Sequence, residues 1–228
     1  MTSADLASIS LRELNAKLHA LPPDTNETRW LVANPGGKHA IACGLTLPIT
    51  VEIDGHVGYY CAGMNSEATV LVKGNAGVGV AENMMSGEVR VQGDASQAAG
   101  ATGNGGLLVI EGNASARCGI SMKGIDIVVK GSIGPMSAFM AQAGNLVVLG
   151  DAGEALGDSI YEARLFVRGA VKSLGADCIE KPMTPDDRHA LDAVLAKAGI
   201  DDVDGGAFRL YGSARKLYHF HVDNVDAY

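Results

Sequence analysis

Cysteine and histidine, the side chains best suited to metal binding and nucleophilic chemistry, are scattered through this sequence. The cysteines are far apart and never occur as Cys-x-x-Cys, at Cys43, Cys61, Cys118 and Cys178. This spacing argues against a zinc knuckle, a cysteine-bound iron–sulfur cluster and a redox pair. His219 and His221 share a strand face without an adjacent third ligand, which favours a packing or surface role.

The stretch Gly74–Gly79 has the glycine spacing of a phosphate-binding loop. The same spacing recurs along the chain, and no helix start with Lys-Ser or Lys-Thr follows it, so the glycines are interpreted as structural. No Gly-x-Ser-x-Gly elbow occurs either. We therefore expect no catalytic residue, no bound cofactor and no metal in this chain.

Composition restricts the partners and the compartment. The chain has 228 residues, enough for one sizeable domain, with 18 Lys and Arg against 26 Asp and Glu. The net charge of −8 makes nucleic acid and anionic membranes poor partners. The apolar runs are too short to span a bilayer, and Met1–Asp5 lacks the features of a secretory signal. With the unpaired cysteines, these features predict a cytoplasmic location.

Glycine recurs every nineteen residues along the chain, at Gly55, Gly74, Gly93, Gly112, Gly131, Gly150 and Gly169. The residues four and two positions before each glycine are branched aliphatics: Val51/Ile53, Val70/Val72, Val89/Val91, Leu108/Ile110, Ile127/Val129, Leu146/Val148 and Leu165/Val167. Alternate aliphatics predict a short strand, and a turn at a fixed period predicts stacked solenoid coils. We expect each glycine to lie where φ is positive or where the coil bends sharply.

The sequence thus predicts an all-β protein, a right-handed parallel β-helix of about seven coils. The handedness follows from the absence of the six-residue aliphatic repeat of left-handed solenoids. An earlier, irregular coil is expected, because Gly36 lies nineteen residues before Gly55 and Val32 fits the position four before the glycine, in line with Val51.

Capping helices are predicted at both ends, because solenoid ends are open edges. Ser10–Glu13 has a capping-box pattern that opens a helix to about Leu21. Thr184–Asp187 opens a second helix, with Gly199 as its stop. The tail Phe208–Tyr228 is predicted to be extended. The chain is thereby divided into an N-terminal helix and linker (1–29), a β-helix (30–182), and a C-terminal helix and tail (183–228).

Two outward-facing groups are candidate partner interfaces. The position three before each glycine is apolar in the last four coils, at Val109, Val128, Val147 and Phe166. Such a stripe needs cover, either from the C-terminal helix or from another subunit. Polar residues gather in the second half of each coil, at Asn65, Asn83, Asn104, Lys123, Gln142, Asp158, Tyr161 and Glu162. They form either a solvated corner with amide ladders or a partner face or channel wall.

The repeat Gly-x-x-Gly-x-x-x-Gly resembles the GXGXG β-helix domain that ends the large subunit of glutamate synthase. Gly150, Gly153 and Gly157 match it fully, and other coils replace the middle glycine by Ser96, Ser115 or Lys172. The resemblance covers about residues 30–182.

The coils are most similar to a free-standing version of this domain, the small β-helix subunit of N-methylglutamate synthase (methylamine–glutamate N-methyltransferase). The similar segments are Ala81–Gly87, Met122–Gly124, Phe139–Gly144, Gly157–Glu162 and Tyr211–Ala214. The resemblance implies a hetero-oligomer with an amidotransferase-like subunit and a synthase subunit that carries FMN and an Fe-S cluster. The implied reaction converts glutamate and methylamine to N-methylglutamate and ammonia. In this family's scheme the present chain braces its partners and contributes no catalytic group.

Two other functions stay open. The β-helix subunit of formylmethanofuran dehydrogenase has the same scaffold in another enzyme class. A homo-oligomeric β-solenoid scaffold would need uncapped ends, which the two predicted helices oppose.

Overall fold

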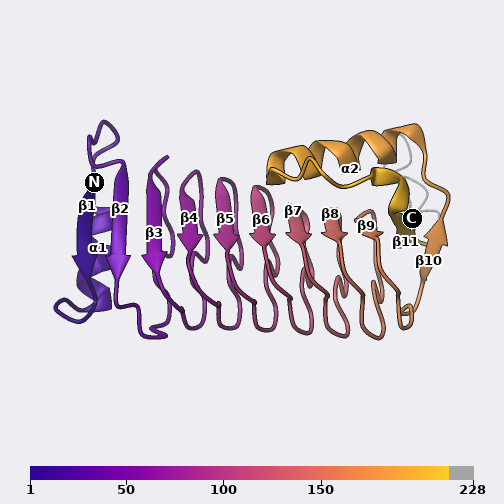
Figure 1. Cartoon of the computed structure of the whole chain (residues 1–228), viewed down its shortest axis with the longest axis horizontal. Helices are drawn as coiled ribbons and strands as arrows, with labels where there is room; N and C mark the ends of the chain where they lie inside the picture. Colours follow the sequence, from indigo (N-terminus) through magenta and orange to yellow (C-terminus); the bar gives the residue numbers. More distant parts are fainter. Residues whose placement is uncertain (216–228) are drawn as a thin grey trace, which may run out of the picture.

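Eleven strands form one sheet in the computed structural model, which describes residues 1–215 (Figure 1). The strands are β1 (Thr2–Asp5), β2 (Arg29–Ala33), β3 (Thr50–Asp54), β4 (Thr69–Val72), β5 (Glu88–Val91), β6 (Leu107–Ile110), β7 (Lys123–Val129), β8 (Ala143–Val148), β9 (Arg164–Val167), β10 (Cys178–Lys181) and β11 (Arg209–Ser213). Their spatial order is β1 to β9, then β11 and β10. The helices are α1 (Leu11–His19), α2 (Pro185–Ala198) and the short 3₁₀ helix η1 (Gly205–Ala207).

Strands β1 to β9 pair in parallel and lie side by side along a rod. From β3 to β9 the register advances by nineteen residues, as in Val51↔Val70 and Val70↔Val89. Isolated parallel bridges such as Val57↔Ala76 join the coils a second time after the glycine turn. The predicted all-β parallel β-helix of about seven coils is confirmed.

The core is a continuous stack of aliphatic side chains inside the coils. All fourteen paired aliphatics named above have 0% of their surface exposed. Burying one such side chain contributes about 1.5–3 kcal/mol before chain entropy is subtracted, so the stack is the main source of stability.

All seven period-nineteen glycines lie at bends of the coil, which is one of the two predicted alternatives, and the structure adds a further reason for glycine. Of the seven, only Gly55 has a φ in the positive range, at 142°. At the others an added Cβ would collide with the preceding coil. At Gly74 it would lie 2.7 Å from the carbonyl carbon of Gly55, and at Gly150 2.6 Å from that of Gly131. Close approach of neighbouring backbones excludes a side chain at this position.

The coil that begins at β2 is longer than the others. Trp30 pairs with Val51 and Val32 with Ile53, a step of twenty-one residues. The predicted early coil therefore exists. Its expected alignment was wrong, because Val32 lies beside Ile53 and not beside Val51.

The N-terminal helix α1 is capped by Ser10, whose hydroxyl accepts a hydrogen bond from the Glu13 N–H. The carboxylate of Glu13 pairs with Lys17 at 3.1 Å. The helix ends at His19, two residues before the predicted end. Its buried residues, Leu14 and Leu18, close the end of the core beside β1 and β2.

The C-terminal helix α2 has the predicted caps. Thr184 and Asp187 form a complete capping box, Pro185 opens the helix, and Gly199 ends it with a φ of 72°. Within the predicted extended tail, Arg209–Ser213 forms strand β11. His219 and His221 lie outside the described residues.

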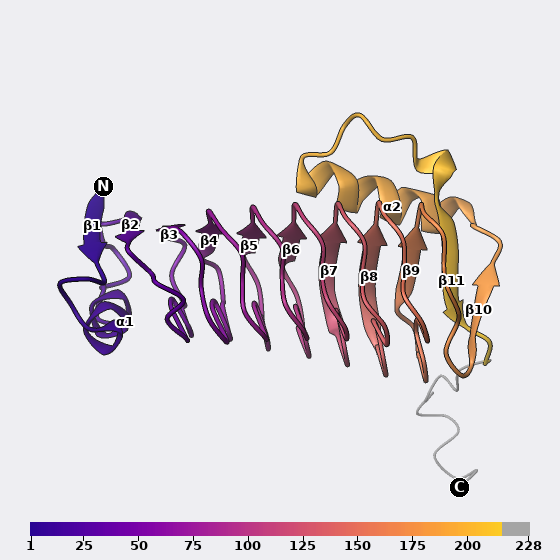
Figure 2. The same ribbon diagram turned by 60° about the horizontal axis from the view of Figure 1, so that its bottom comes forward.

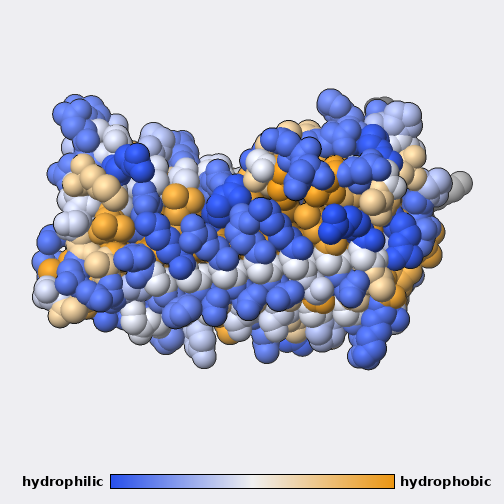
Figure 3. All heavy atoms as spheres, viewed as in Figure 1, coloured by the Kyte–Doolittle hydropathy of each residue, from blue (hydrophilic) through white to orange (hydrophobic). Residues whose placement is uncertain are grey.

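Helix α2 lies along the outer face of the sheet over β6 to β9 (Figure 2). Val109, Val128, Val147 and Phe166 have 0% exposed surface beneath it, packed against Leu191, Val194 and Leu195. Figure 3 shows the contrast on this face, with hydrophilic residues over β3 to β5 and hydrophobic residues around α2. Of the two covers considered for this stripe, the chain's own helix is the one present, so these four residues are not accessible to a partner.

Candidate partner-binding surface

The second half of each coil is a curved segment that follows the β-bridge and leads into the next strand. We call the surface of these segments the turn face; it comprises residues 58–68, 77–87, 96–106, 115–125, 134–144 and 153–163, of which 123–125 and 143–144 already belong to β7 and β8. At least three positions per segment have positive φ, as at Tyr60, Ala62 and Met64 with φ of 60°, 54° and 55°. The left-handed residues are tied to neighbouring coils, for example by Ala81 N–H to Cys61 O at 2.9 Å. The turn face is therefore a fixed surface in which every nineteenth residue stacks.

Four predicted candidates form one outward column of the turn face. Asn104, Lys123, Gln142 and Tyr161 are all exposed and occupy equivalent positions in successive coils. Each backbone N–H donates to the coil before, as in Lys123 N–H to Gly103 O at 2.7 Å and Gln142 N–H to Met122 O at 2.8 Å. Met85 extends this column towards the N-terminus.

Asn65 does not belong to this surface. It is fully buried and shares its column with Met84 and Met122, which also point inward. Its Nδ2 donates to Ala68 O at 2.7 Å and to Ser86 O at 3.1 Å, while its Oδ1 has no partner. The interface prediction for Asn65 is wrong because the residue lies one position earlier in its coil than Asn104 does.

Asn83 lies in the neighbouring column of left-handed residues. Its Nδ2 donates to the Tyr60 hydroxyl at 3.1 Å, and its Oδ1 accepts from the Thr102 hydroxyl at 2.6 Å. These two bonds link three successive coils, so Asn83 is part of a short polar ladder on the turn face.

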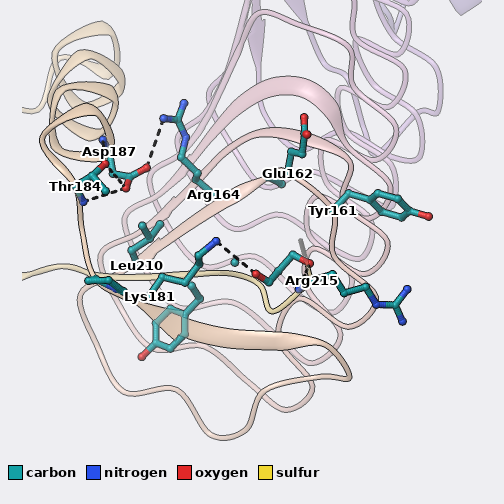
Figure 4. Close-up of a pocket in the computed structure, with 13 residues that line it drawn as sticks. Tyr161, Glu162, Arg164, Lys181, Thr184, Asp187, Leu210 and Arg215 are labelled. Atoms are coloured by element: carbon teal, nitrogen blue, oxygen red, sulfur yellow. Dashed lines mark hydrogen bonds and ion pairs between the residues drawn. The ribbon is translucent and has the colours of Figure 1, made fainter. Parts of the chain in front are cut away.

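Asp158 also links coils: its Oδ2 accepts from Ala176 N–H at 3.1 Å, and its Oδ1 accepts from the Ser159 hydroxyl at 2.8 Å. Tyr161 and Glu162 stand at the rim of an open pocket of about 470 Å³ at the C-terminal end of the rod (Figure 4). Its wall also holds Arg164 and Lys181.

The charged groups of this pocket do not converge on one point. Arg164 points towards Asp187, 3.8 Å away, and Lys181 donates to Ser213 O at 3.4 Å. Tyr161 and Arg215 extend away on the opposite side (Figure 4). These side chains therefore do not point towards a common position at which a small ligand could bind.

The turn face is poor in charge and rich in exposed apolar side chains. The four segments between 77 and 144 contain only three charged residues, Glu82, Arg117 and Lys123. Exposed large apolar residues have 36–58% of their surface accessible: Tyr59, Met64, Val78, Met85, Met140 and Tyr161. Low charge with Met and aromatic enrichment is typical of the buried centre of protein interfaces.

One polar ladder was missed by the sequence reasoning. The residue directly after each of the first six period-nineteen glycines accepts a backbone N–H from the next coil at 2.7–3.0 Å: His56, Asn75, Asp94, Asn113, Ser132 and Asp151. The predicted amide ladder was placed in the other half of the coil. The sequence signal that could have revealed this ladder is the run of acceptor side chains at the position directly after the glycine.

The thiols are held in their protonated form. Burial raises the pKa of Cys118 to about 12 and that of Cys43 and Cys178 to about 11. Burial also raises the pKa of Cys61, with a further contribution from nearby Cys43. A nucleophilic cysteine needs a lowered pKa and access to solvent, so the buried Cys61 and Cys118 are structural.

Within residues 1–215, no three His, Cys, Asp or Glu side chains are grouped closely enough to hold a metal ion. In the same residues, no helix is both long and apolar enough to cross a membrane.

The fold and this surface define a class: a parallel β-helix with one outer face closed by its own helix and a weakly charged turn face left open. No family model matches the chain. It is 64% identical over 228 residues to Protein GlxC of Rhizobium meliloti (strain 1021), and the match covers 100% of both chains. The chain belongs to the family of GlxC.

Proposed function

We propose that this chain is a structural subunit, without catalytic residues of its own, of a glutamate-synthase-like flavoenzyme. The enzyme favoured by the resemblance of the coils is cytoplasmic N-methylglutamate synthase, which forms N-methylglutamate and ammonia from glutamate and methylamine. The partners would be an amidotransferase-like subunit and a synthase subunit that holds FMN and an Fe-S cluster. This chain would hold the two in register and border the passage between them.

The observation that carries this proposal is the turn face. Helix α2 covers the apolar stripe over β6 to β9, but nothing within the described chain covers Met64, Met85 or Met140. Exposed apolar side chains on a rigid, weakly charged surface favour association with another protein. The elongated rod offers this surface over six successive coils, long enough for two partners.

Affinity purification of the tagged full-length chain from its native cells tests the assignment. We expect two co-purifying subunits, a flavin absorption spectrum, and N-methylglutamate formation from methylamine and glutamate. A colourless chain that elutes alone or as a homo-oligomer would contradict the enzyme assignment. Co-purification with a molybdenum or tungsten subunit would favour the formylmethanofuran dehydrogenase alternative.

A pair of variants tests the surface. Met85→Glu places a charge in the middle of the turn face, where Met85 is 52% exposed. We expect it to weaken partner binding on the order of tenfold or more, because a hot-spot side chain contributes more than about 1.4 kcal/mol. Ile179→Glu is the matched control, since Ile179 is 44% exposed on β10, away from the turn face. Equal effects of both variants would remove the turn face from the proposed interface.

A further inference from the structure

We propose that Asn104 is a site of spontaneous deamidation, at which the free chain gains a negative charge on the turn face. Asn104-Gly105 is the single Asn-Gly pair of the sequence. Glycine has no Cβ, so its backbone nitrogen can approach the preceding carboxamide with the least hindrance. This inference concerns the chain's own chemistry and does not depend on the proposed function.

The Asn104 side chain is exposed and weakly held. Its Nδ2 has two long contacts, to Met85 Sδ and to Thr102 O, both at 3.4 Å. By contrast, Asn75 and Asn113 use their Oδ1 atoms as ladder acceptors at 3.0 and 2.9 Å. Those two carboxamides are fixed by the neighbouring coil, whereas the carboxamide of Asn104 is free to rotate towards the following nitrogen.

Stacking of the coils restricts the residue that makes this pair reactive. A Cβ on Gly105 would lie 2.7 Å from the carbonyl oxygen of Met85, so any larger residue would require one of the two coils to shift. The Gly105 N–H makes only a long contact of 3.4 Å with Met84 O. In the comparison sites the following residue is alanine, at Ala76 and Ala114. The local packing of the turn face therefore favours the glycine of the reactive pair.

The reaction needs only water. The Gly105 nitrogen attacks the Asn104 carboxamide carbon; a C–N bond forms, the bond to Nδ2 breaks, and ammonia leaves with the proton from the glycine nitrogen. Water then opens the resulting five-membered imide at either carbonyl. One opening gives aspartate and the other gives isoaspartate, in which the main chain runs through the β-carbon. No oxidant or reductant is involved.

Both products change the turn face. A carboxylate at position 104 lies between Met85 and Lys123 in the same column, one coil spacing of about 4.8 Å from each, and can pair with the Lys123 ammonium. The isoaspartyl form lengthens the main chain by one atom. That breaks the register of the bonds from Asn104 N–H to Met84 O and from Lys123 N–H to Gly103 O, both 2.7 Å.

Peptide mapping by mass spectrometry of the folded full-length chain, incubated at mildly alkaline pH, tests the proposal. We expect aspartate and isoaspartate to accumulate several-fold faster at Asn104 than at Asn75 or Asn113. Asn104→Gln should abolish the change in that peptide and leave the circular dichroism spectrum unaltered. Equal rates at the three asparagines would overturn the proposal. So would an Asn104 that stays intact in the folded chain while it deamidates in urea, because the fold would then block the attack.

Discussion

The outer face of the sheet has two halves with the same backbone, of which one faces the solvent and the other is covered by α2. At one repeat position the open half, over β3 to β5, carries Glu52, Leu71 and Arg90. The covered half, over β6 to β9, carries Val109, Val128, Val147 and Phe166, all fully buried under α2. The coils are interchangeable in backbone geometry, so side-chain identity at this position decides which half receives the helix.

The open half is held by ion pairs that run across the coils. Glu52 Oε1 lies 2.9 Å from an Arg29 nitrogen, and its Oε2 lies 3.1 Å from Lys73 Nζ. Such exposed pairs contribute about 0–1 kcal/mol each. Charged side chains meet the solvent on this half, so it needs no helix over it.

The covered half combines an apolar cluster with polar contacts at its edge. Asp126, 9% exposed, accepts from Asn145 Nδ2 at 2.7 Å and pairs with Lys197 Nζ of α2 at 3.1 Å. Asn145 in turn accepts from Arg164 Nε at 2.9 Å. These contacts fix where α2 lies along the sheet, while the apolar side chains supply most of the attraction.

The largest expected effect comes from Val147→Asp compared with Leu71→Asp at the equivalent position. The first leaves an unpaired carboxylate beneath α2 and should cost about 3–5 kcal/mol. The second lies on the open half and should cost less than about 1 kcal/mol. Urea unfolding of both variants measures the difference. Similar losses would mean that the two halves are not distinguished by burial.

The next effect is expected at the border between the halves. Arg90 donates to Glu111 at 2.8 Å and to Ala198 O, the last residue of α2, at 3.0 Å. Arg90→Met should destabilise the end of α2 by about 1.5–3 kcal/mol, because hydrogen bonds from a charged donor are lost. Faster hydrogen exchange of the Leu195–Ile200 amides would measure this loss of stability. The control, Arg29→Met on the open half, should leave those amides unchanged.

The smallest effect is expected in the stability of the protein at acidic pH. Hydrogen bonds from Arg29 and then Lys73 lower the pKa of Glu52 below its ordinary value of 4.5. A lowered folded-state pKa gives stability above pH 4.5 that is lost as the pH falls through the folded value. Glu52→Gln should therefore flatten the acid limb of the stability curve, and added salt should reduce the difference. Glu67→Gln, an exposed site on the turn face, is the control; an equal change there would contradict the assignment to Glu52.

Much of the difference between the open and the covered half could be predicted from the nineteen-residue period of the sequence. The pairs Val51/Ile53 to Leu165/Val167 fixed the strands and the core, because alternate aliphatics at a constant period have one packing solution. The apolar stripe at Val109 to Phe166 was recognised as needing cover. Its cover could not be chosen from the repeat, because α2 lies outside the repeat and packs through contacts distant in sequence.

Other features depended on local geometry that a repeat alone does not reveal. Asn65 and Asn104 look alike as polar residues of the turn face. Asn65, however, lies one position earlier in its coil, and its side chain points inward. The period-nineteen glycines were expected at positive φ or at sharp bends; they lie at bends, and the close approach of backbones seen at Gly74 is a further requirement that the repeat did not reveal. The sequence thus indicated which half of the coil the polar candidates occupy, but not which of them point outward.

The constant step between coils also makes this protein a molecular ruler. Each nineteen-residue insertion or deletion in the open half changes the length of the rod by one strand spacing, about 4.8 Å, and leaves every ladder bond intact. The same change in the covered half shifts Asp126 relative to Lys197 of α2, or Arg164 relative to Asp187 of α2, and disrupts the packing of α2 on the sheet. Evolution or design can therefore adjust the distance between the two ends in whole coils, but only on the side of the rod where Glu52 and Leu71 meet water.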